Sequence, residues 1–172
     1  MSSPSAALAV CALLGALVAA PAARADADAF FDTSLGDLRA ELDTARQQGK
    51  QAVLLMFEME GCPYCRRMRQ TVLNRADVQT YFHRHFLIFS VDTHGSLTLN
   101  DFAGRELSER RLAESMQVRG TPTFVFVDLD GREMSRYVGA TRDAAEFMRL
   151  GRAAAGRVKV ETDANKEGSS DK

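Results

Sequence analysis

The sequence has no excess of charge of either sign and contains only three cysteines among its 172 residues. Lys and Arg number 22 and Asp and Glu number 23, so the chain lacks the basic surface that nucleic-acid binding requires. It also lacks a repeat of fixed period and a second Cys-x-x-Cys pair. Its length and its 45% hydrophobic content are enough for one globular domain with its own core. We therefore expect a single domain without a nucleic-acid partner.

The first part of the chain resembles a targeting segment. An apolar run extends from Ala6 to Ala20, which is shorter than the roughly 20 residues that a membrane-spanning helix needs. Pro21 follows, and Ala23-Arg24-Ala25 has the small-residue pattern of a signal-peptidase site. We predict a secretory signal peptide at residues 1–25, with cleavage after Ala27 as the alternative, and therefore an exported, periplasmic protein.

Two other interpretations of this segment stay open. No Lys or Arg precedes the apolar run, which would also suit an uncleaved anchor. Lipidation at Cys11 is a weaker alternative, because Val10 is larger than the small residue expected before a lipidated cysteine. Cleavage would remove Cys11 and leave Cys62 and Cys65 as one close pair in an oxidising compartment.

This pair stands in the sequence Cys62-Pro63-Tyr64-Cys65 and has three interpretations. Structural zinc normally needs four ligands, and His83 and His85 are two positions apart rather than three to five. A structural disulfide across so short a loop would remove little chain entropy. A redox-active dithiol explains the spacing, because positions i and i+3 in the first turn of a helix lie on one face. We therefore predict a redox-active disulfide, with no metal and no other cofactor.

The flanking sequence places the pair at the start of a helix. Residues 51–57 form a continuous apolar run of strand length, and the residues after the pair have helical spacing as far as Phe82. Pro63 suits the first helical position, where its missing N–H has no cost. Cys62 would then be the N-cap, where free backbone N–H groups and the helix dipole favour a thiolate. We predict that Cys62 is the nucleophile and that Cys65 is the resolving thiol.

The rest of the chain alternates between helix and strand patterns. Helices are predicted at 35–50, with Leu35 on the buried face, at 107–118, with Ser108 as N-cap, and at 141–156; strands are predicted at 86–92 and 121–128, followed by a hairpin strand at 132–139. Residues 28–33 should form a short leading segment packed on the core. We therefore expect the domain to span 26–156 and the polar tail, 157–172, to be disordered.

This order of elements resembles the thioredoxin superfamily. The resemblance is carried by Cys62-Pro63-Tyr64-Cys65 and by Thr121-Pro122-Thr123, which enters a strand. It implies an α/β, thioredoxin-like fold of three layers, in which helices flank a central mixed β-sheet. Residues 92–107 would be an insertion before the proline region, with room for a small hairpin.

For the site, the resemblance implies that Pro122 is cis and lies against the dithiol. Thr121 would offer its backbone hydrogen bonds to a bound substrate strand. Pro63 and Tyr64, between the cysteines, would also contact the substrate.

Two departures from the superfamily pattern concern the neighbours of the dithiol. Gly61 stands where thioredoxins have a tryptophan, and the chain contains no tryptophan at all. Met56 replaces the acidic residue that thioredoxins bury behind the cysteines. Glu58 lies on the same face of the predicted strand as Met56, and we treat it as a candidate proton acceptor for Cys65, with Glu60 as the alternative.

The exported context and the extended segment before the proline are similar to periplasmic thioredoxin-like proteins of sulfur-oxidation (Sox) systems. This resemblance implies a monomeric thiol:disulfide reductase, without stable membrane insertion after processing, that acts on disulfides of periplasmic partner proteins. Sulfur-oxidation carrier proteins are the suggested partners, and a membrane electron donor would re-reduce the pair. A disulfide oxidase or isomerase, or a non-catalytic module that binds partners in the cis-proline groove, are the alternatives. The direction of electron flow stays open. The Pro-Tyr dipeptide between the cysteines is that of glutaredoxins, whose redox potentials lie between those of thioredoxin and DsbA.

Overall fold

The computed structural model describes residues 26–167, so the predicted signal peptide at 1–25 lies outside the described residues. The elements are the 3₁₀ turn η1 (Asp28–Phe30), α1 (Leu38–Gln47), β1 (Ala52–Glu58), α2 (Pro63–Met68), the π-helical turn η2 (Arg69–Leu73), α3 (Ala76–His85), β2 (Phe86–Asp92), β3 (Thr98–Asn100), β4 (Glu106–Ser108), α4 (Glu109–Ser115), β5 (Thr123–Val127), β6 (Glu133–Val138) and α5 (Ala144–Glu167). The predicted strands are all present, within two residues of their expected ends.

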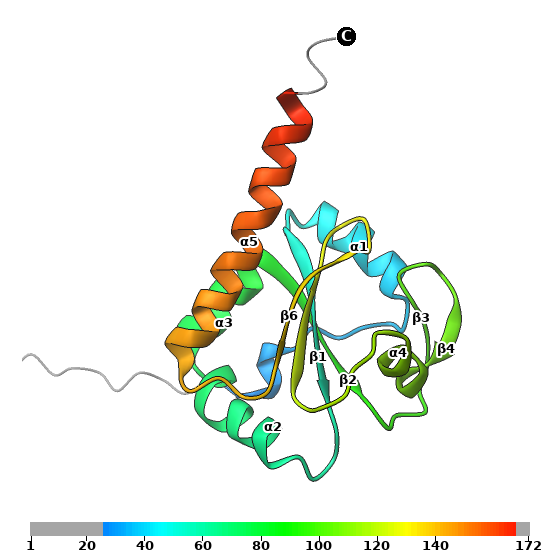
Figure 1. Cartoon of the computed structure of the whole chain (residues 1–172), viewed down its shortest axis with the longest axis vertical. Helices are drawn as coiled ribbons and strands as arrows, with labels where there is room; N and C mark the ends of the chain where they lie inside the picture. Colours follow the sequence, from blue (N-terminus) through cyan, green and yellow to red (C-terminus); the bar gives the residue numbers. More distant parts are fainter. Residues whose placement is uncertain (1–25, 168–172) are drawn as a thin grey trace, which may run out of the picture.

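The central sheet has the strand order β2-β1-β5-β6. Strands β1 and β2 are parallel, whereas β5 is antiparallel to both β1 and β6, so the sheet is mixed. Helices α2, α3 and α5 cover one face, and α1 and α4 cover the other (Figure 1). The predicted three-layer, thioredoxin-like α/β fold is therefore confirmed.

Strand β1 is buried on both faces and leads directly to the cysteines. Its residues alternate between the two cores: Leu54 and Met56 contact the core under α2, α3 and α5, and Leu55 and Phe57 contact the core under α1 and α4. Because helices cover both faces of the sheet, a strand whose residues are nearly all apolar, instead of alternating between apolar and polar, is stable at this position.

Helix α1 begins three residues later than predicted. Asp37 is its N-cap and accepts a hydrogen bond from the Ala40 N–H at 2.9 Å. Gly36 precedes this cap with a φ of +84°, a conformation that glycine adopts freely. Leu35 therefore lies before the helix and is 95% exposed, and the expectation that it packs in the core was wrong.

The predicted continuous helix after the cysteines is divided into α2, η2 and α3. The Asn74 side chain donates a hydrogen bond to the Gln70 carbonyl oxygen at 2.7 Å, four residues back. Arg75 then adopts extended backbone angles as the N-cap of α3. A side-chain bond of this kind competes with the helical ladder, which explains why the helix stops at Asn74.

The expectation of a disordered tail was wrong for residues 157–167, because α5 continues to Glu167. The sequence between Gly156 and Gly168 contains neither proline nor glycine, so no helix-breaking residue occurs there. No helix within residues 26–167 is both long and apolar enough to cross a membrane.

The insertion before the proline region forms the small hairpin β3–β4, with Asp101 at its turn. The Asp101 carboxylate is buried and accepts hydrogen bonds from the N–H groups of Ala103 and Arg105 and from the Arg105 guanidinium. Burial raises the pKa of Asp101, but these hydrogen bonds outweigh that effect and leave the pKa below 3.8. The turn therefore depends on an ionised carboxylate.

The Asp101→Ala variant should lower the free energy of unfolding by about 1–3 kcal/mol at pH 7, because the hydrogen bonds from the N–H groups of Ala103 and Arg105 to a charged carboxylate are lost. Since the folded pKa lies below the unfolded value, this stabilisation is present above about pH 4 and is lost as the pH falls through the folded pKa. Urea denaturation of both proteins at pH 7 and at pH 3 measures the difference. Asp130→Ala, at an exposed turn, is the control. Equal stability of Asp101→Ala and the unmodified protein at pH 7 would contradict the prediction.

Candidate active site

Cys62 and Cys65 form a disulfide at the start of α2, with their Cα atoms 5.3 Å apart. Cys62 is the N-cap of the helix and Pro63 occupies its first turn, as the sequence predicts. The loop from β1 makes its last turn at Gly61, whose φ is +75°. The sheet and the helix thus hold the first sulfur at a helix N-terminus.

The sulfur of Cys62 faces two hydrogen-bond donors. The Cys65 N–H is 3.1 Å from Cys62 Sγ, and the Thr121 Oγ1 is 3.3 Å from it. The residue is 5% exposed, so little water competes with these donors. In the reduced protein such donors stabilise a thiolate over a thiol, which is the form that attacks disulfides.

The loop before β5 lies directly beside this sulfur. The Thr121–Pro122 peptide bond is cis, and the Pro122 carbonyl oxygen accepts a hydrogen bond from the Gly139 N–H at 2.8 Å. Within residues 26–167, no backbone hydrogen bond uses the N–H or the carbonyl of Thr121. These free groups can pair with an extended substrate strand next to Cys62.

The space behind the cysteines is apolar. Met56 is completely buried and belongs to the same core cluster as Cys62 and Cys65. Glu58 lies on the same face of β1, but its carboxylate accepts hydrogen bonds from the Arg69 guanidinium and from the Ser90 hydroxyl. Among the described residues it makes no hydrogen bond to Cys65, and its role as a proton acceptor stays a prediction.

Arg69 is a residue near the site that the sequence did not indicate. Besides Glu58 it binds the Asp28 carboxylate at 2.6 Å, and its guanidinium lies 4.5 Å from the centre of the Phe31 ring. The hydrogen bond with Glu58 is the main reason that the pKa of Arg69 is raised above its ordinary value. These partners come from segments far apart in the chain, so only the fold brings them together.

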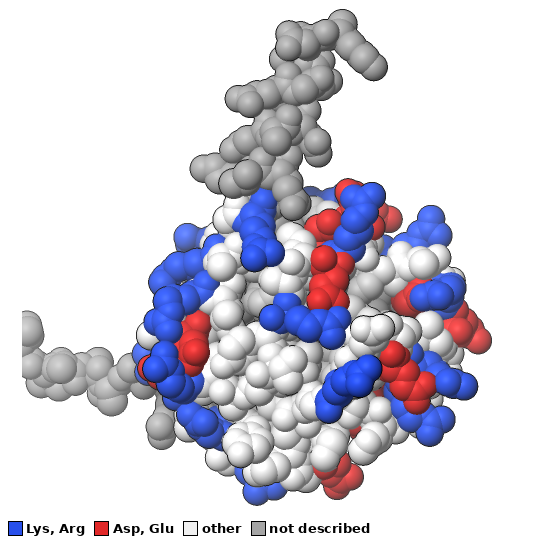
Figure 2. Space-filling view, viewed as in Figure 1, with Lys and Arg blue, Asp and Glu red and all other residues white. Residues whose placement is uncertain are grey.

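Exposed apolar side chains lie beside the two cysteines. Met59 and Tyr64 are 38% and 60% exposed, and Pro63 between the cysteines is also exposed. Figure 2 shows an uncharged area between α2 and β6, with acidic atoms at the loop that follows β1 and charged side chains of both signs over α4. A partly apolar surface next to a Cys-x-x-Cys disulfide suits contact with another protein.

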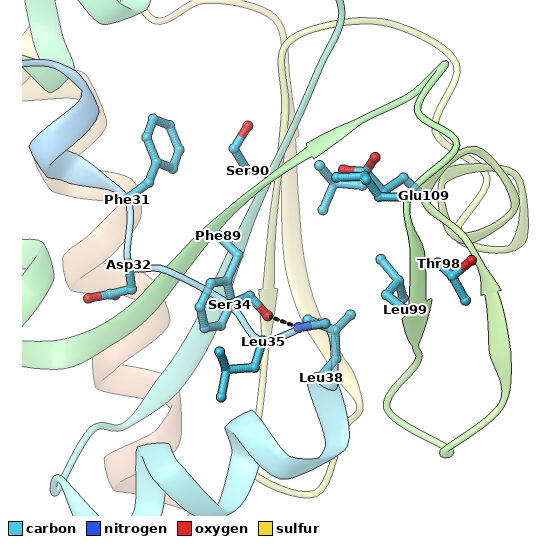
Figure 3. Close-up of a pocket in the computed structure, with 13 residues that line it drawn as sticks. Phe31, Asp32, Ser34, Leu35, Leu38, Phe89, Ser90, Thr98, Leu99 and Glu109 are labelled. Carbon is cyan, nitrogen blue, oxygen red and sulfur yellow. Dashed lines mark hydrogen bonds between the residues drawn. The ribbon is translucent and has the colours of Figure 1, made fainter.

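Two cavities differ in whether their lining includes residues next to Cys62. A groove of about 630 Å³ includes Met59 and Thr121 in its lining and so reaches the site. A second cavity, of about 400 Å³, lies between the segment 31–38, β2 and the β3–β4 hairpin (Figure 3). Leu35 and Ser90 line this second cavity, whose lining includes neither Met59 nor Thr121.

A mixed four-stranded sheet with a Cys-x-x-Cys pair at a helix start, next to a cis-proline loop, defines the thioredoxin class of folds. A family model described as thioredoxin-like domain matches residues 38–155, and the chain belongs to this family. A comparison with curated proteins gives no match.

Solved structures agree with this assignment. The chain is 33% identical to a thioredoxin from Thermus thermophilus, with a TM-score of 0.51, over 65% of this chain and 78% of that one. A thioredoxin-fold protein from Helicobacter pylori has a TM-score of 0.55 at 18% identity, over 79% and 96% of the two chains. The reduced DsbD C-terminal domain from Neisseria meningitidis has a TM-score of 0.51 at 20% identity, over 68% and 93%. The last two similarities concern the fold alone.

Proposed function

We propose that this protein is an exported thiol:disulfide oxidoreductase that reduces disulfides of periplasmic partner proteins through Cys62 and Cys65. The observation that carries the proposal is the environment of Cys62 Sγ, which faces two donors and lies beside Thr121, whose backbone groups take part in no backbone hydrogen bond within residues 26–167. The family assignment and the similarity to a thioredoxin support the same chemistry. The exported location depends on the sequence of residues 1–25.

The reaction proceeds by two exchanges. The Cys62 thiolate attacks one sulfur of a substrate disulfide, and the other substrate sulfur leaves as a thiolate. Cys65 then attacks Cys62 Sγ, which releases the second substrate thiol and forms the Cys62–Cys65 disulfide. Two electrons thus pass from the dithiol to the substrate, and a membrane electron donor restores the dithiol. We propose that the protein acts as a monomer on sulfur-oxidation carrier proteins, the partner class that the sequence resemblance suggests.

The redox potential tests the direction of this reaction. Equilibration with glutathione buffers, followed by thiol labelling, should give a value of about −200 to −230 mV, as for other proteins with this dipeptide. The reduced protein should also reduce insulin disulfides. A potential near −120 mV, together with rapid oxidation of reduced unfolded proteins, would support a disulfide oxidase instead. Failure to exchange with any dithiol or disulfide would support the non-catalytic binding module.

A further inference from the structure

A groove next to the reactive sulfur carries basic side chains that the two exchanges do not use. It begins at Thr121, whose hydroxyl donates to Cys62 Sγ at 3.3 Å, and has a volume of about 630 Å³. His94 lines it from the segment after β2, Arg110 from α4, and Arg119 from the loop that leads to the cis-proline. The groove is therefore continuous with the site where a substrate disulfide reacts.

The charge of this groove is not neutralised by the part of the chain that the structure describes. Arg110 and Arg119 are exposed, and within residues 26–167 neither forms an ion pair. The one acid in the lining, Glu114, is bound by Arg111 at 2.9 Å. Glu60 stands close to the cysteines in the sequence but does not line the groove. Two guanidinium groups are thus free to bind an external anion.

We infer that this groove binds acidic residues that flank the target disulfide of a protein substrate. The inference rests on the proposed function, since the substrate is the one that reacts with Cys62. A substrate strand that pairs with Thr121 places its cysteine at Cys62 and its neighbouring side chains over Arg110 and Arg119. Guanidinium groups bind carboxylates through paired hydrogen bonds, and a basic surface raises the association rate of acidic partners.

The test uses three synthetic peptides, each oxidised to a disulfide-linked dimer, in which Glu, Gln or Lys occupies the positions on both sides of the cysteine. Stopped-flow mixing with the reduced protein gives the second-order rate constant for each peptide. We expect the Glu peptide to react about tenfold faster than the Gln peptide and the Lys peptide to react most slowly. The Glu preference should largely disappear in about 0.5 M NaCl, because salt screens exposed charges.

The variants locate the preference. The double variant Arg110→Gln/Arg119→Gln should lower the ratio of Glu to Gln rate constants to about one. The matched control Arg84→Gln/Arg149→Gln removes two exposed arginines on α3 and α5, on the opposite face of the sheet, and should keep the ratio. Equal rates for the three peptides, or a preference that persists without the groove arginines, would overturn the inference. Hydroxyethyl disulfide, which is neutral, serves as the reference: if the unmodified protein fails to reduce it, the proposed function itself is wrong.

Discussion

Replacing Cys62 by Ser should lower the rate of disulfide reduction by at least about 1,000-fold, because Cys65, the only other cysteine within residues 26–167, lies one turn further into α2 and not at its N-terminus. The sulfur of Cys62 lies at the helix N-terminus, between the Cys65 N–H and the Thr121 hydroxyl, where a negative charge is stabilised. Serine has a hydroxyl in the same place, and a hydroxyl is neither ionised near neutral pH nor able to form a disulfide. Insulin reduction by the purified mature protein measures the loss.

Cys65→Ser should behave differently, because it removes only the second exchange. Cys62 can still attack the substrate, and the mixed disulfide then accumulates instead of resolving. Expression of this variant in the native host, followed by identification of the proteins bound to Cys62, would reveal the partners. The Cys62→Ser/Cys65→Ser double variant is the control and should capture none.

The captured proteins also test the proposed partner class. Capture of sulfur-oxidation carrier proteins is the expected outcome. Capture of cytochrome c maturation proteins alone would contradict that assignment while leaving the reductase chemistry intact.

If Cys62→Ser reduced insulin as fast as the unmodified protein, Cys62 would not be the nucleophile.

The fold and the centre of the site could be predicted because their signals are local in the sequence. The apolar run of β1 predicts a strand buried on both faces, and Pro63 between the cysteines predicts a helix that starts at Cys62. The Ser108 N-cap of α4 could also be predicted, because a capping side chain accepts its hydrogen bond from an N–H group only three residues further along the chain. Thr121-Pro122 required the resemblance to a family, because a proline in a sequence does not reveal what it will lie against.

The features that could not be predicted depend on contacts between distant segments or on competition between local bonds. Arg69 meets Glu58 and Asp28 only after the chain has folded. Its charge alone is compatible with an ordinary surface residue. Asn74 ends the helix through a side-chain bond that a helical apolar pattern does not reveal. The groove of Arg110 and Arg119 likewise arises where a helix and a loop come together.

The Phe82→Ala variant should lower the free energy of unfolding by about 3–5 kcal/mol, which is a large part of the stability of a domain of this size. Phe82 is completely buried, and its ring stacks on that of Phe147 with centroids 4.4 Å apart. The rings of Phe30 and Phe86 are 5.6 and 5.5 Å away. Removal of this ring therefore takes contacts from η1, β2 and α5 at once, and few neighbours can move to fill the cavity. Chemical denaturation measures the loss; Tyr81→Ala, at a partly exposed neighbouring position, is the control and should cost less.

Gly151 in α5 tests whether this packing is as tight as the distances indicate. A Cβ atom at this position would lie 2.7 Å from Phe82 Cζ, closer than atoms can pack. Gly151→Ala should thus destabilise the protein by about 1–3 kcal/mol, although the same change in an exposed helix stabilises it by about 0.5–1 kcal/mol. In a Phe82→Leu background the ring atom is absent, so the penalty of Gly151→Ala should shrink or change sign. A double-mutant cycle measured by denaturation gives this coupling directly. If the effects of the two substitutions on the free energy of unfolding were additive, contact with the Phe82 ring would not be the reason that position 151 requires glycine.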